Sequence, residues 1–184
     1  MGEGSIGILR LSGPQALVAG QTIFSSAKEN TIAKPEPRKL IYGKIRDPRS
    51  GEYIDEALFV YMPGPHSYTA EDVVELHLHG STQSLQLTLG ILLEIQGIRL
   101  AEPGEFTQRA FLNGRLDLSQ AEAVIDVIRS RTDRSLKAAV GQLAGGLASK
   151  INEISNPLLD LIARLSDILV LFAQGSYLIS HNAN

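Results

Sequence analysis

A short stretch of the chain carries three ionisable side chains at two-residue spacing, Glu75, His77 and His79. Because successive side chains of a β-strand point to opposite faces, this spacing places all three on one face of a strand. A carboxylate there can accept two parallel hydrogen bonds from a planar pair of N–H donors, as the edge of a pterin or guanine ring offers. Glu75 is therefore a candidate binding residue. From the residues alone, a solvated strand face or a carboxylate paired with an arginine is the favoured interpretation.

The two histidines could also form half of a metal site, because their imidazoles share a face and Glu75 could supply a third ligand. Metal sites usually have further partners that orient the histidines, and nothing else in the sequence points to them. Histidines with structural hydrogen bonds are the favoured interpretation. The sequence therefore predicts no metal site.

Arginines are the second group of candidates. Arg10 lies inside an apolar run with strand character, where a cation needs an anionic partner or an anionic ligand. A carboxylate of the same domain would serve equally well as that partner. Arg109 and Arg115 lie on either side of an Asn-Gly turn at 113–114, and Arg115 could simply be exposed.

The segments that position these residues alternate between the strand and the helix pattern, which is typical of an α/β or α+β domain. Val74, Leu76 and Leu78 form the apolar face of the strand that carries Glu75. Turn-forming residues at 47–51 join two further strands into a hairpin. The predicted strands are Ser5–Leu11, Leu40–Arg46, Tyr53–Met62, Asp72–His79 and Ile98–Ala101, and the predicted helices of this part cover 13–24 and 81–95.

After residue 118 the pattern becomes helical. Ser119 and Glu122 have the spacing of a capping box, and apolar residues then recur at helical spacing, which predicts a helix over 119–131. One or two more helices are predicted over 133–173, with kinks or breaks at Gly145-Gly146 and Asn156-Pro157. The predicted domains are 1–118 for the α/β part and 119–173 for the start of a helical domain, followed by a tail at 174–184 that neither pattern assigns.

Composition excludes several classes of protein. The chain has 184 residues, enough for one compact domain with an appended helical piece, and its net charge of −3 argues against generic polyanion binding. It has no cysteine, which excludes disulfides and thiolate metal sites. No signal-peptide pattern occurs, and the apolar stretch 158–173 is interrupted by charges and too short to span a bilayer. We expect a soluble protein with no membrane partner.

Two glycine-containing stretches match nucleotide-binding motifs only superficially. Gly2–Gly7 fits the dinucleotide fingerprint G-x-G-x-x-G, but no strand precedes it, and a strand rather than a helix follows. Gly141–Lys150 ends in lysine but lacks the spacing G-x-x-x-x-G-K-[ST]. The sequence therefore predicts no dinucleotide site, and no P-loop that could bind GTP, within these residues.

Three longer motifs occur in order, at Gly4–Gly13, Met62–Gly80 and Pro103–Asp126. Together they resemble the signatures of the MnmE (TrmE) family of tRNA-modification GTPases, and the resemblance extends over residues 4–165. Three ordered motifs of this length are far more specific than one short pattern. The chain is thus similar to the N-terminal folate-binding and dimerisation domain of that family, followed by the start of its helical domain.

The resemblance implies a fold, a ligand and a set of contacts. The fold is an α+β or α/β domain with a mixed sheet and flanking helices, like the folate-binding fold of aminomethyltransferases, followed by an α-helical segment. The ligand is a 5,6,7,8-tetrahydrofolate derivative, in its 5-formyl or methylene form. The family's folate contacts correspond to Arg10, Glu75 and Arg115. The family often has lysine at the last position, and arginine keeps the charge but changes the geometry.

The resemblance also implies a cellular context. The complete family member is a cytoplasmic homodimer and a GTP hydrolase that acts with the flavoprotein MnmG on the wobble uridine of tRNA. GTP, Mg²⁺ and K⁺ belong to a G domain whose motifs do not occur in these 184 residues. This chain is therefore expected to bind the folate without hydrolysing GTP, and none of its residues is expected to be catalytic.

The chain departs from the family in places, and two other functions stay open. The family has another strand before Gly4, residues 166–184 do not follow its pattern, and Ser81 stands where a second glycine is common. The first alternative is a dimerisation scaffold without functional folate binding. The second is a stand-alone folate-dependent one-carbon transferase, which would need His77 or His79 as a general base.

Overall fold

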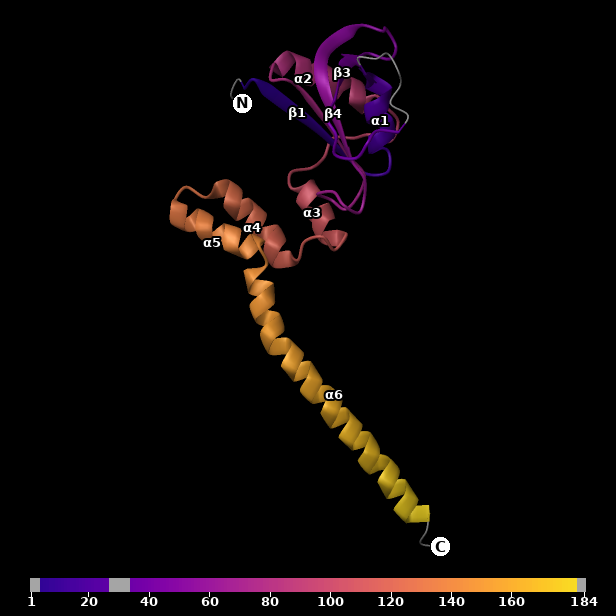
Figure 1. Cartoon of the computed structure of the whole chain (residues 1–184), viewed down its shortest axis with the longest axis vertical. Coiled ribbons are helices and arrows are strands. Elements are labelled where there is room, and N and C mark those ends of the chain that lie inside the picture. Colours follow the sequence, from indigo (N-terminus) through magenta and orange to yellow (C-terminus); the bar gives the residue numbers. More distant parts are fainter. Residues whose placement is uncertain (1–3, 27–33, 182–184) are drawn as a thin grey trace. The chain divides into compact units, whose positions relative to one another are not determined.

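The computed structural model of the protein describes residues 4–26 and 34–181, with side chains except those of 147–148 and 167–181. The chain divides into two compact units, Met1–Leu116 and Asp117–Asn184, called unit 1 and unit 2 below (Figure 1). Gly2 of the fingerprint-like stretch and the last three residues of the predicted tail lie outside the described residues. The predicted class, an α/β or α+β part followed by helices, is confirmed.

Unit 1 is built on a five-stranded sheet with the strand order β1-β5-β4-β3-β2. The pairings between these strands are antiparallel, where the resemblance implied a mixed sheet. The predicted hairpin is present, because β3 pairs with β4 around the turn at 47–51. The elements of unit 1 are β1 (Ile6–Ser12), α1 (Ala16–Ile23), β2 (Phe24–Ser26), β3 (Ile41–Arg46), β4 (Tyr53–Met62), β5 (Val73–His79), α2 (Thr82–Leu93) and α3 (Glu105–Leu112).

The alternation along β5 decides which face of the sheet is buried. Val74, Leu76 and Leu78 are buried, as predicted, whereas Glu75 and His77 are partly exposed. Helices α1 and α2 cover the buried face, and their apolar side chains join those of the strands in one core. The polar face of β5 is thereby left available for binding. The largest fully buried apolar side chains are Phe59, Ile23, Ile45, Leu76, Val73 and Val74.

Unit 2 consists of α4 (Leu118–Arg129), α5 (Asp133–Leu143) and α6 (Gly146–His181). Helices α4 and α5 pack against each other, and the predicted break at Gly145 is confirmed by its left-handed φ of +83°. At Pro157, where a kink or break was predicted, the helix is not broken, because α6 continues through this residue. Proline removes one helical N–H donor, and the remaining hydrogen bonds of this long helix maintain it on both sides.

The predicted cap of α4 is two residues too late. The residue that caps the helix is Asp117, whose Oδ1 accepts from the backbone N–H of Gln120 at 2.8 Å, while the Gln120 side chain accepts from the Asp117 N–H at 3.0 Å. Ser119 lies inside the first turn and donates to Asp117 at 2.7 Å. A carboxylate at the N-cap also favours the positive end of the helix dipole, so Asp117 outcompetes the serine.

The predicted strand Ile98–Ala101 does not form. No strand among the described residues pairs with it, and a strand needs a neighbour to satisfy its backbone groups. The side chain of Arg99 donates instead to the carbonyl of Leu100 at 3.0 Å and to Glu105. The segment is therefore an extended connection from α2 to α3.

No helix in the described part of the chain is both long and apolar enough to cross a membrane.

Candidate ligand-binding site

Arg10 and Glu75, two of the predicted site residues, lie directly opposite each other on β1 and β5. Backbone hydrogen bonds at the two ends of this ladder, from Gly80 to Ser5 and from Gly13 to Asp72, place the hydrogen-bonded pairs at the odd-numbered positions of β1. Arg10 is therefore at a non-hydrogen-bonded position, where facing side chains approach most closely. Its Nε and Nη2 both donate to Glu75 Oε1, at 2.7 and 2.6 Å.

The second oxygen of Glu75 is engaged as well. His77 Nε2 lies 3.0 Å from Glu75 Oε2, so a neighbour on the same strand face completes the arrangement. The Glu75 side chain is only 14% exposed, whereas Arg10 is 43% exposed. Burial alone would raise the pKa of Glu75, but the hydrogen bonds and charges of His77 and Arg10 outweigh it and hold the pKa below its ordinary value. The carboxylate is an ionised acceptor at neutral pH.

His79 does not join this group. Its Nδ1 lies 2.6 Å from Asp55 Oδ1, and Ser84 donates to the other carboxylate oxygen at 2.6 Å. The hydrogen bond and charge of Asp55 raise the pKa of His79 above its ordinary value. Within the described part of the chain, no three side chains of ligand type are grouped so that they could hold a metal ion.

Each of the two predicted binding arginines lies over an aromatic ring. The guanidinium carbon of Arg10 is 5.8 Å from the centroid of Phe106, and that of Arg115 is 5.0 Å from the centroid of Tyr68. Both distances are within the range of cation–π attraction. Arg10 and Arg115 therefore lie over two different rings. The sequence reasoning missed both rings, although each is next to a charged or hydroxyl residue within a motif.

Helix α3 connects the two aromatic rings. Phe106 belongs to its first turn, and the adjacent Thr107 Oγ1 lies 3.0 Å from the hydroxyl of Tyr68. At the other end, Gly114 has a φ of +72°, which closes the predicted Asn-Gly turn and leads directly to Arg115. The backbone N–H of Arg115 donates to the carbonyl of Ala110 at 2.9 Å, which fixes the start of its side chain.

Helix α3 is fixed in turn by a group of charges around Glu105, its first residue. The carboxylate of Glu105 accepts from Arg99, from Arg109 and from the backbone N–H of Glu102, at 2.5–3.0 Å. Hydrogen bonds from Arg99, Glu102 and Arg109 lower the pKa of Glu105 from its ordinary 4.5 to about 2. Arg109 also donates to both oxygens of Glu71 at 3.1 Å.

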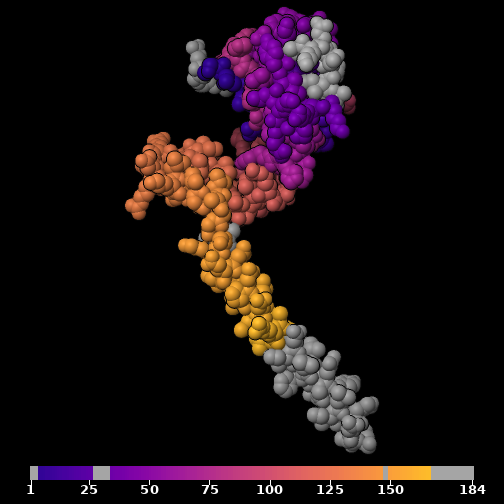
Figure 2. All heavy atoms as spheres, in the orientation of Figure 1, coloured from indigo at the N-terminus to yellow at the C-terminus, as the bar shows by residue number. Residues whose placement is uncertain are grey.

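The loop at 63–72 completes this part of unit 1. Ser12 of β1 donates to Glu71 at 2.9 Å, and Asn113 at the end of α3 donates to the carbonyl of Thr69 at 2.7 Å. Figure 2 shows α3 packed against the magenta surface of this loop. Strand β1, the loop and α3 therefore form one cross-linked frame around Arg10, Tyr68 and Arg115.

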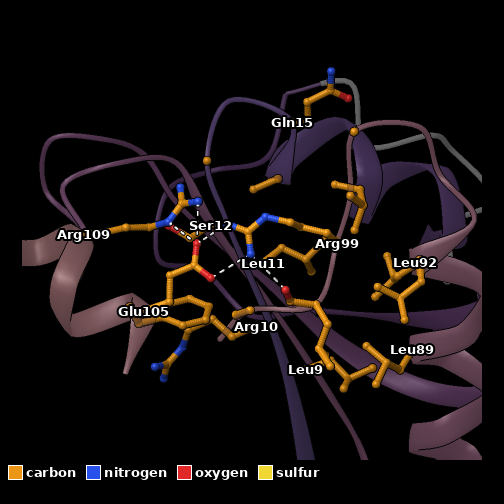
Figure 3. Close-up of a pocket in the computed structure, with 18 of the residues that line it drawn as sticks. Leu9, Arg10, Leu11, Ser12, Gln15, Leu89, Leu92, Arg99, Glu105 and Arg109 are labelled. Atoms are coloured by element: carbon orange, nitrogen blue, oxygen red, sulfur yellow. Dashed lines mark hydrogen bonds and ion pairs between the residues drawn. The ribbon is translucent and has the colours of Figure 1, made fainter. Parts of the chain in front are cut away.

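A cavity of about 430 Å³ lies beside this frame, between β1, α2 and the segment 97–101. Its volume is within the range of small-molecule sites. Figure 3 shows Arg99, Glu105 and Arg109 directed toward one another on one side, with Leu89 and Leu92 of α2 on the other. Arg10 and Phe106 belong to the lining, whereas Glu75 and Arg115 do not. Of the three predicted binding residues, Arg10 is thus the one that belongs to the lining.

Comparison with known proteins assigns both units. The family described as "GTP-binding protein TrmE N-terminus" matches residues 1–115, and the "MnmE helical domain" matches residues 118–169. Proteins named "tRNA modification GTPase MnmE" are 51% identical over 163 residues in Carboxydothermus hydrogenoformans and 50% identical over 164 residues in Symbiobacterium thermophilum. In each case the match covers 89% of this chain and 35% of the relative, so the chain spans about a third of the relatives' length.

Proposed function

Because this chain belongs to the MnmE (TrmE) family of tRNA modification GTPases, of which it carries the N-terminal and helical parts, we propose that unit 1 binds a reduced folate, a 5,6,7,8-tetrahydrofolate derivative. The observation that carries the proposal is the carboxylate of Glu75, which is ionised, largely buried and oriented by two neighbours on the polar face of β5. Such a group suits the planar N–H donors of a pterin ring.

The other side chains of the frame suit the remainder of a folate. Folates carry carboxylates in their glutamate tail, and Arg10 and Arg115 are cations that can pair with them. The rings of Phe106 and Tyr68 offer flat apolar surfaces next to these charges. The donor and acceptor types present therefore fit a folate. When bound, the folate would supply the one-carbon unit.

The rest of the proposal concerns the longer protein. The relatives' name supports a role in tRNA modification, and we place GTP hydrolysis, with its Mg²⁺ and K⁺, in parts of the family beyond these residues. We also propose a cytoplasmic homodimer that acts on tRNA together with a flavoprotein of the MnmG type. Ile6 and Ile8, exposed on edge strand β1, supply apolar surface for contact with a second copy.

Calorimetric titration with 5-formyltetrahydrofolate tests the binding. We expect the wild-type protein to bind and Glu75→Gln to bind about 10- to 100-fold more weakly, because hydrogen bonds to a charged group contribute about 1.5–3 kcal/mol. Glu52→Gln, at an exposed position of unit 1, is the matched control and should bind like the wild type. A folded wild-type protein that gives no binding heat at high micromolar ligand would refute the proposal.

A further inference from the structure

The carboxylate expected to receive the folate is already engaged by two side chains of the protein. Arg10 donates two N–H groups to Glu75 Oε1, and His77 lies on Oε2. The guanidinium of Arg10 is planar, directs both of its N–H groups to one carboxylate oxygen, and lies over the ring of Phe106. A pterin edge at Glu75 would use the same kinds of contact. The protein's own side chain therefore imitates the ligand that we propose for this site.

We propose that Arg10 competes with the donor edge of the ligand for Glu75, so that binding proceeds by exchange of partners and selects ligands that carry both a donor edge and a carboxylate. This inference rests on the proposed folate binding. The ligand's donor edge replaces Arg10 at Glu75, and the released guanidinium pairs with a carboxylate of the glutamate tail. A pterin without that tail breaks the Arg10–Glu75 pair and gives Arg10 no new partner.

Exposure and position indicate that Arg10, rather than His77, is the partner that leaves. Arg10 is 43% exposed and belongs to β1, at one edge of the sheet that the described residues form, whereas His77 is 23% exposed and lies within β5. The Arg10 end of the pair is partly exposed, so water screens its charge and can solvate it when it leaves Glu75. A ligand that supplies new donors to the carboxylate can therefore take the place of this cation.

The surroundings of Arg10 support its pairing with a carboxylate of the ligand's glutamate tail after it leaves Glu75. The Arg10 side chain is 43% exposed, so a guanidinium released from Glu75 is open to a ligand on this face of the sheet. The other two arginines that line the cavity beside β1 are held by carboxylates, Arg99 by Glu105 and Arg109 by Glu105 and Glu71. Arg10 is thus the arginine of the lining that does not pair with the lining's carboxylate, Glu105, and it is the one that can respond to a ligand.

Two probes that share the donor edge, only one of which has the tail, separate this exchange from simple binding. They are 5-formyltetrahydrofolate and 6-methyltetrahydropterin, which keeps the donor edge and lacks the 5-formyl group and the aminobenzoyl-glutamate. We would titrate both into the wild type, Arg10→Ala and the exposed control Arg46→Ala, whose folding is checked by circular dichroism. Arg10→Gln, which keeps the length of the side chain without its charge, is the second variant if alanine impairs folding.

We expect Arg10→Ala to bind the tail-free pterin about three- to fivefold more tightly than the wild type, because the competing pair is gone. The same variant should bind 5-formyltetrahydrofolate about tenfold more weakly, because the tail loses its cation. The ratio of the two affinities therefore falls by more than tenfold, while Arg46→Ala keeps the wild-type ratio.

The possible results separate failure of the proposed exchange from failure of the proposed folate binding. If the wild type binds the folate and Arg10→Ala weakens both probes equally, or changes neither, the exchange is overturned and the proposed function stands. If the folded wild type binds neither probe, the proposed function and the exchange fail together.

Discussion

Glu75 and Glu105 are both carboxylates of unit 1 that accept hydrogen bonds from arginine, yet their surroundings differ. Glu105 is held by two arginines and a backbone N–H, and Arg109 links it to a second carboxylate, Glu71. Glu75 has one arginine, on an edge strand, and one histidine. A carboxylate bonded on every side fixes the fold, whereas one with a single exposed cation can exchange that cation for a ligand.

The largest expected effect is on stability at the Glu105 group. Arg109→Ala leaves Glu105 and Glu71 without their shared cation, so we expect the free energy of unfolding to fall by about 2–3 kcal/mol. Urea-induced unfolding measures this loss. Arg99→Ala is the matched control, because Arg99 is 61% exposed and binds only one carboxylate, and it should cost less. Equal losses for the two variants would break the distinction between a central and a peripheral cation.

The second-largest effect is expected when the pH is lowered, and it is a loss of stability through the same group around Glu105. The pKa of Glu105 is lowered from 4.5 to about 2 by Arg99, Glu102 and Arg109, so the folded state binds its proton less readily than the unfolded state. Its stabilising contribution is therefore complete above pH 4.5 and disappears as the pH falls toward 2. Thermal unfolding across this range should show Glu105→Gln with a shallower decline in melting temperature than the wild type. Parallel declines would contradict the assignment.

The smallest effect on stability is expected at the Glu75 group. Arg10→Ala should lower the free energy of unfolding by less than about 1 kcal/mol, because the pair is partly exposed and His77 still contacts the carboxylate. Urea-induced unfolding under the conditions used for Arg109→Ala gives a direct comparison. A loss as large as that of Arg109→Ala would show that Arg10 is a structural cation and would remove the contrast between the two carboxylates.

The local patterns of the sequence predicted most of the elements of unit 1 and the faces of β5. Alternation is a property of neighbouring residues, so Val74 and Leu76 could be assigned to the core before any contact was known. The pairing of Arg10 with Glu75 joins residues 65 positions apart and depends on the register of β1 with β5, which no local pattern contains. The sequence could therefore nominate both residues but could not show that they bond to each other.

The sequence predictions that were wrong also depend on contacts that local patterns do not contain. Ile98–Ala101 has the apolar character of a strand, but a strand forms only with a partner, and the sequence does not say whether one is present. At the start of α4, two overlapping capping patterns compete, and the hydrogen bonds of Asp117 with Gln120 decide between them. The network from Arg99 to Glu71 combines β1, the 63–72 loop and α3, so it becomes visible only in three dimensions.

The central claim, that the Glu75 group exchanges partners for a ligand and the Glu105 group does not, can be tested in one titration. Arginine Nε–Hε signals are followed by nuclear magnetic resonance as 5-formyltetrahydrofolate is added to the ¹⁵N-labelled protein, with the Arg10 signal assigned by its loss in Arg10→Ala. We expect the Arg10 signal to shift with saturation, because its hydrogen bond to Glu75 is replaced, while the Arg109 signal stays in place. A saturating ligand that leaves Arg10 unchanged, or that moves Arg109 instead, would contradict the account.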